Sequence, residues 1–145
     1  MSLIRFSLDQ YNLPVFHVAD SKYRALGAWL IIDISVDYDV CLDALADVED
    51  ISHERPVEHW DSEHFEVAIG ADGIRFDNYH VDESGSYNLA ELREALEDYW
   101  RFLVTRPEKP GLVRQYWTDL PLWQADLLLW EQRHERKHPY RGGLF

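Results

Sequence analysis

Apolar and polar residues alternate most clearly in two short segments that are separated by a few turn residues. Phe65–Ile69 and Ile74–Phe76 both place apolar side chains at every second position, which is the period of a β-strand with one buried face. The intervening residues include Asp72-Gly73, a dipeptide that favours the positive φ angles of a tight turn. We therefore predict an antiparallel hairpin over residues 65–76.

The second half of the chain changes to the period of an amphipathic helix. Apolar residues recur there at spacings of three and four, namely at Leu92, Leu96, Tyr99, Trp100 and Leu103. Asn88 and Glu91 have the spacing of a capping box, in which each side chain bonds the backbone N–H of the other residue. These features predict a helix over about 89–104. Pro121 marks the beginning of a second long helix, over about 121–136.

The first half of the chain is less regular. Tyr11–Val18 reads as an extended segment that Pro14 confines to the edge of a sheet. Gly27–Val36 is rich in β-branched and aromatic residues and is predicted to be a strand. Val40–Val48 has helical spacing, and we expect Asp39 to cap this short helix. The fold predicted over residues 1–145 is a single α+β domain, with an antiparallel sheet covered by the two long helices.

Composition is that of a globular protein that needs no covalent or metal cross-link. The 145 residues are 46% apolar and 14% aromatic, which is enough for a packed core. Cys41 is the only cysteine, so neither an intramolecular disulfide nor a cysteine zinc site can form, and its apolar setting predicts a buried thiol. The longest apolar run, Ala25–Ile32, is far shorter than a membrane span, and the N-terminus lacks signal-peptide features. We expect a cytoplasmic protein.

Negative charge is concentrated in the middle of the chain. The net charge is −13, and residues 33–66 carry twelve acidic groups against one basic group, whereas residues 101–145 carry eight basic and five acidic groups. Such a surface repels nucleic-acid phosphates and anionic membranes, so neither is an expected partner. A basic protein is the expected partner. The predicted partner-binding carboxylates are Asp33, Asp37, Asp39, Asp43, Asp47, Glu49, Asp50 and Glu54.

The same carboxylates also suit a merely solubilising face, and the sequence leaves the two interpretations about equal. Catalytic motifs such as GxSxG, a P-loop or GxGxxG are absent, so we predict no catalytic residue and no cofactor. The alternative function is a small metal-dependent hydrolase that would use the histidines of the His53–His80 region, although their spacing matches no known metal pattern and ordinary surface histidines are favoured. A further alternative is a non-catalytic subunit of a larger assembly, with the Trp-rich tail as its interface.

One part of the sequence resembles a known class of proteins. The residues are Trp60–Phe65, the hairpin turn at Ala71-Asp72-Gly73, and a helix opened by Leu89–Leu92 in which the pattern ELxxALxxYWxFL starts at Glu91. This arrangement of about 45 residues resembles small bacterial immunity proteins of polymorphic toxin systems, such as contact-dependent growth inhibition. The resemblance implies an inhibitor that binds and blocks a basic nuclease toxin. It implies no particular functional residue.

Overall fold

The computed structural model describes residues 2–55, 60, 62–70, 73–111 and 113–145. Within these residues the chain forms four α-helices and two antiparallel sheets, which confirms the predicted α+β class. The strands are β1 (Ile4–Leu8), β2 (Pro14–Val18), β3 (Phe65–Gly70), β4 (Gly73–Asn78) and β5 (Ser84–Tyr87). The α-helices are α1 (Arg24–Trp29), α2 (Tyr38–Ser52), α3 (Leu89–Thr105) and α4 (Leu122–His134), with a short 3₁₀ turn at Ser21–Tyr23 and a π-helical turn, η2, at Leu30–Ile34.

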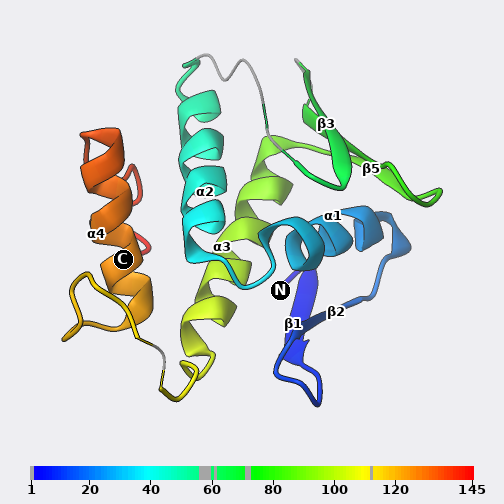
Figure 1. Ribbon diagram of the computed structural model, residues 1–145. Helices are drawn as coiled ribbons and strands as arrows, with labels where there is room; N and C mark the ends of the chain where they lie inside the picture. Colours follow the sequence, from blue (N-terminus) through cyan, green and yellow to red (C-terminus); the bar gives the residue numbers. More distant parts are fainter. Residues whose placement is uncertain (1, 56–59, 61, 71–72, 112) are drawn as a thin grey trace.

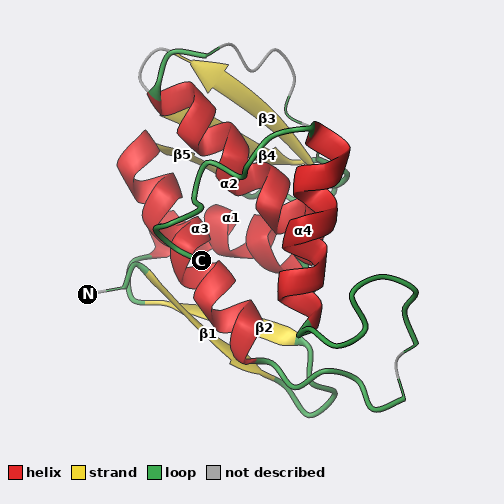
Figure 2. Cartoon of the chain, turned by 90° about the vertical axis from the view of Figure 1, so that its left-hand side faces the viewer, coloured by secondary structure: helices red, strands yellow, loops and turns green. Residues whose placement is uncertain are grey.

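The two sheets lie at opposite ends of the helices, and α1 lies between them (Figures 1 and 2). Figure 1 shows α2 between α4 and α1, with α3 behind it. Of the two long helices, α3 contacts β1 and β4, whereas α4 packs against α2 on the side away from the three-stranded sheet. Helix α2 therefore contacts both α3 and α4.

The predicted hairpin is present. β3 and β4 pair in an antiparallel register from Phe65 opposite Asn78 to Gly70 opposite Gly73, and Phe65 and Phe76 are buried. The residues 71–72 of its turn lie outside the described part of the chain. Gly73 has a φ of 150°, and a Cβ atom there would lie 2.3 Å from the carbonyl oxygen of Tyr87, so glycine is required where β5 joins β4.

Two short strands were not among the predicted elements. β1 pairs with β2, which begins at Pro14 and lies at an edge as predicted. β5 extends the hairpin to three strands although its sequence, SGSY, contains a glycine and two serines. Such residues have little strand preference, so β5 forms because β4 offers it an unpaired edge.

The predicted strand at Gly27–Val36 is wrong, because this segment is helical. It forms α1 and then the π-helical turn, whose last bond runs from the N–H of Ser35 to the carbonyl of Leu30. Leu26, Trp29 and Leu30 are all 2% exposed or less. Residues 25–30 are all buried, so this stretch has no polar face and its hydrophobic pattern cannot distinguish a helix from a strand.

The caps of the long helices follow local hydrogen-bonding rules. Asp37, and not the predicted Asp39, caps α2, because its side chain accepts the N–H groups of Asp39 and Val40. The capping box of Asn88 and Glu91 is present at the beginning of α3, as predicted. α4 ends at His134, two residues earlier than predicted, because Glu135 adopts the left-handed conformation.

The core joins α1, α2 and α3 with the inner faces of both sheets. Its largest fully buried side chains are aromatic, namely Trp29, Trp100, Trp130, Tyr99, Phe65 and Phe76. Gly27 lets α1 approach β2 closely, since a Cβ atom at this position would lie 2.5 Å from the Phe16 ring. None of the described helices is both long and apolar enough to cross a membrane.

Candidate functional site

A groove of about 780 Å³ runs along α2, between α4 on one side and η2 with Trp60, Ser62 and Glu63 on the other. We call it the acidic groove. Its charged lining among the described residues consists of five carboxylates and one guanidinium, together with a histidine: Asp33, Asp43, Asp47, Asp50, Glu63, Arg136 and His134. Three indoles also line it, those of Trp29, Trp60 and Trp130. Four of the eight predicted partner-binding residues therefore share one hollow.

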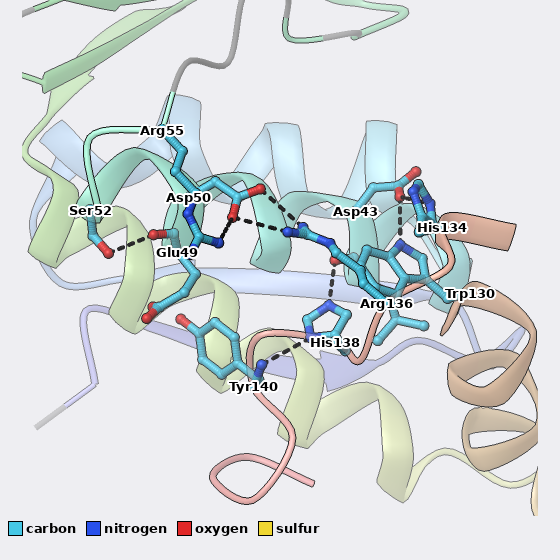
Figure 3. Close-up of polar contacts among 11 residues, drawn as sticks. Asp43, Glu49, Asp50, Ser52, Arg55, Trp130, His134, Arg136, His138 and Tyr140 are labelled. Carbon is cyan, nitrogen blue, oxygen red and sulfur yellow. Dashed lines mark hydrogen bonds and ion pairs between the residues drawn. The ribbon is translucent and has the colours of Figure 1, made fainter. Parts of the chain in front are cut away.

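Asp50, in the last turn of α2, holds a basic side chain from the far end of the sequence. Both terminal nitrogens of Arg136 contact its carboxylate, with Nη2 3.0 Å from Oδ2 and Nη1 3.4 Å from Oδ1 (Figure 3). Arg55 approaches the same carboxylate at 3.5 Å. A guanidinium with two parallel contacts to one carboxylate is the geometry that arginine recognition favours.

Asp43 connects the middle of α2 to α4. Its Oδ1 accepts the indole N–H of Trp130 at 2.7 Å and lies 3.4 Å from Nε2 of His134. The imidazole of His134 stacks on the Trp130 ring, with centroids 4.2 Å apart. The carboxylate is half exposed, at 49%, so it keeps a solvent-facing side in the groove.

The remaining predicted carboxylates of α2 also contact neighbouring helices. Glu49 pairs with Arg93 of α3 at 2.8 Å, and Asp39 pairs with Arg133 of α4 at 3.1 Å. Burial, and the nearby carboxylate of Asp43, raise the pKa of Asp39 above its usual value, although Arg133 opposes this. Part of the predicted binding surface is thus used to hold α3 and α4 against α2.

Asp33 lies in η2 and is almost completely buried, with 5% of its side chain exposed. Its carboxylate accepts the backbone N–H of His64 and the hydroxyl of Ser62, and it lies 2.6 Å from Nδ1 of His64. The carboxylate therefore fastens the segment that enters β3 to the π-helical turn. It has no free oxygen left for an ion pair with a partner.

Three predicted residues have other settings. Asp37 is the cap of α2, so its carboxylate is engaged with backbone N–H groups. Glu54 is exposed and has a φ of 58°, just after the C-terminus of α2. Asp47 lines the acidic groove and makes contacts of its own.

The histidines predicted as an alternative metal site do not form one cluster in the described residues. His64 and His80 are neighbours, with ring centroids 5.6 Å apart, whereas His53 pairs with Glu49 at the end of α2. His59 lies outside the described residues. In the part of the chain that the structure describes, no group of three or more His, Cys, Asp and Glu residues could hold a metal ion.

His138 has a structural role that the sequence pattern did not indicate. It is 1% exposed, and its Nε2–H donates to the carbonyl of Leu42 at 2.8 Å while its Nδ1 accepts the N–H of Tyr140 at 3.1 Å (Figure 3). Burial lowers the pKa of His138 from 6.5 to about 4, although the Leu42 carbonyl and the nearby Glu131 carboxylate oppose that shift. Cys41 is fully buried, as predicted, and burial raises the pKa of its thiol.

Trp29, Trp60 and Trp130 were missed as parts of the site. Trp130 and Arg136 lie more than 80 residues from the carboxylates that they contact, so no local sequence signal could connect them. The opposite charges of the middle and the tail of the chain were the one available hint.

Comparison with known proteins adds no relative to this description. No protein-family model, no curated protein and no solved structure matches the chain.

Proposed function

We propose that this protein is an acidic inhibitory binding protein that neutralises a basic protein, as an immunity protein neutralises the nuclease domain of a bacterial toxin. The observation that supports this most strongly is the acidic groove. Its described lining contains five carboxylates and one guanidinium, and the side chains of Asp43 and Glu63 are exposed to solvent, so negative charge is accessible in the groove. Unbalanced charge of one sign in a hollow focuses the electrostatic potential and attracts an oppositely charged partner.

The pairing of the other carboxylates refines the proposal. Asp39 and Glu49 already bind arginines of α4 and α3, and Asp33 and Asp37 are engaged in local hydrogen bonds. These four residues support the shape of the binding surface. Direct contact with the partner falls to the carboxylates that line the groove with exposed oxygens.

The proposal predicts that a toxin domain is encoded next to this gene, and the test co-expresses that domain with the protein in a host that the domain arrests. We expect the wild-type chain to restore growth. The variant Asp43→Asn, Asp47→Asn, Glu63→Gln should restore it less and should bind the purified domain at least tenfold more slowly at low salt, with a flatter salt dependence. The absence of a toxin domain at that locus, or no binding to it, would contradict the proposal.

A matched control separates position from total charge. The variant Glu66→Gln, Asp82→Asn, Glu94→Gln removes the same three charges from exposed residues that do not line the groove. This control should keep a near wild-type association rate. Equal slowing by both triple variants would show that only net charge matters and that the groove is not the binding surface.

The metal-dependent hydrolase remains a second candidate because of one contact. The buried carboxylate of Asp33 orients the imidazole of His64 through Nδ1, and His80 lies beside that ring. Elemental analysis of the purified protein tests this candidate. Stoichiometric zinc or manganese that is lost in His64→Ala would favour the hydrolase over the inhibitor.

A further inference from the structure

Arg136 lines the acidic groove and is bound there by other residues of the same chain. Besides its two contacts with Asp50, its guanidinium carbon lies 5.5 Å from the centre of the Trp130 ring. A cation that makes two contacts with a carboxylate and lies over an indole ring is recognised by charge, hydrogen bonding and a cation–π contact together. The groove thus already contains one complete arginine-binding arrangement, occupied by the chain's own residue (Figure 3).

One residue of the groove lining has a buried donor without an acceptor. Trp29 forms part of its lining and is 2% exposed, and its indole Nε1 has no hydrogen-bond partner among the described residues. Leaving a buried N–H unpaired costs about 1–3 kcal/mol, so such a group is normally satisfied by a ligand or by water.

The groove is larger than Arg136 alone requires. A volume of about 780 Å³ lies within the range of ordinary ligand sites, and the carboxylates of Asp43 and Glu63 line the groove together with Asp50. Asp43 is 49% exposed and Glu63 is exposed, so their oxygens remain accessible.

We propose that the acidic groove binds an arginine-bearing segment of the partner polypeptide, and that Arg136 occupies the arginine place until the partner displaces it. This inference rests on the proposed function, because it names the chemistry of the partner at the same site. Arginine is specified over lysine, since an ammonium group cannot make the two parallel contacts that the guanidinium makes with Asp50.

The inference is tested with three synthetic peptides that differ only in one side-chain type. They are acetyl-Gly-Arg-Gly-Arg-Gly-amide and its counterparts with lysine or with citrulline, which has the shape of arginine without its charge. Binding is followed by the fluorescence of the groove tryptophans and by calorimetry at low salt. We expect the arginine peptide to bind at least fivefold more tightly than the lysine peptide, and the citrulline peptide to show no binding.

Two matched variants test the displacement. Arg136→Gln empties the arginine place and should tighten binding of the arginine peptide about threefold or more. Arg133→Gln removes the same charge from a residue that pairs with Asp39 and does not line the groove, so it should change affinity less. Equal affinity for arginine and lysine peptides, or equal effects of the two variants, would overturn the inference.

The outcomes separate this inference from the proposed function. A basic partner that binds through the groove carboxylates, combined with no arginine preference and no effect of Arg136→Gln, overturns the inference and leaves the inhibitor function standing. If the peptides bind with arginine selectivity but the neighbouring toxin domain does not bind, the proposed function is contradicted. The inference that the groove binds arginine then still holds.

Discussion

At the scale of single residues, His138 is the side chain whose chemistry depends most on its surroundings. Its ring lies among Trp130, Tyr140 and Phe145, and both ring nitrogens are engaged in the neutral form. A proton added to Nδ1 would face the N–H of Tyr140, which is itself a donor. The acidic and basic groups around it are Glu131, Asp43 and Arg136.

The first prediction concerns the pH dependence of stability. The folded-state pKa of about 4 lies below the unfolded value of 6.5, so between these values the unfolded chain binds more protons. The contribution of neutral His138 is therefore complete above pH 6.5 and is lost as the pH falls towards 4, by about 3 kcal/mol in total. Urea unfolding between pH 4 and 7.5 should show this slope.

The pH dependence of the unfolding free energy, and not its absolute value, shows whether His138 is the titrating group. His138→Gln should flatten the profile in this window, because glutamine does not titrate. His134→Gln is the matched control, since that ring stands four residues earlier and its side chain is 46% exposed. An unchanged slope in His138→Gln would refute the assignment.

At the scale of elements, α2 begins at a position that its sequence leaves ambiguous. Asp37 and Asp39 both precede the apolar run, and either could accept a free N–H group at a helix terminus. Ser35 adopts a positive φ and ends the π-helical turn, which sets the extended backbone at Asp37 that a cap requires. The preceding turn therefore decides which aspartate caps the helix.

The second prediction tests that assignment. Asp37→Ala should lower the free energy of unfolding by about 1 kcal/mol, whereas Asp37→Ser, which keeps a capping oxygen, should cost much less. Asp39→Asn should have little effect, because Asp39 lies near other carboxylates that oppose its charge and its pair with Arg133 is partly exposed. Denaturant titrations of the three variants give the comparison. A larger loss in Asp39→Asn than in Asp37→Ala would show that the cap is misassigned.

The same scale explains which elements the sequence could predict. The β3–β4 hairpin and α3 each have one buried and one exposed face, so their periods are visible in the sequence. α1 is buried almost all round, η2 is a single π-helical turn, and β5 is short and polar, so none of the three has a readable period. Their conformations depend on neighbours that are distant in the sequence.

At the scale of the whole molecule, the acidic middle and the basic tail bind each other. Arg133 and Arg136 of the tail contact Asp39 and Asp50 of α2. Asp39 and Asp50, which were predicted to bind a partner, therefore hold the C-terminal part of the chain against α2. Among the described residues that line the groove, carboxylates still outnumber arginines by five to one.

The third prediction compares two carboxylates that contribute to the net charge of −13 but have opposite effects on stability. Glu131 accepts a hydrogen bond from Nη2 of Arg141 at 2.6 Å and another from the backbone N–H of His138. The contact with Arg141 holds the pKa of the Glu131 carboxyl below its usual value. Its contribution is present above the unfolded pKa and is lost as the pH falls through the folded one. Glu131→Gln should therefore cost on the order of 1 kcal/mol at pH 7.

Glu66 supplies the comparison for that measurement. It is exposed on β3 directly opposite Asp77 of β4, and like charges in such a cross-strand pair are unfavourable. Glu66→Gln should leave stability unchanged or raise it by about 0.5 kcal/mol. Unfolding of both variants at pH 7 and low salt checks the contrast. Equal changes of the same sign would show that total charge, and not local pairing, controls stability.

The sequence by itself determined the α+β class, the hairpin, the two long helices and the excess of negative charge, because these depend on local period, capping and composition. Only the tertiary structure decided that Gly27–Val36 is helical and that four of the predicted carboxylates share one groove with three tryptophans. The physical reason is separation along the chain. Asp50 and Arg136 are 86 residues apart, and their contact exists only once α4 packs against α2.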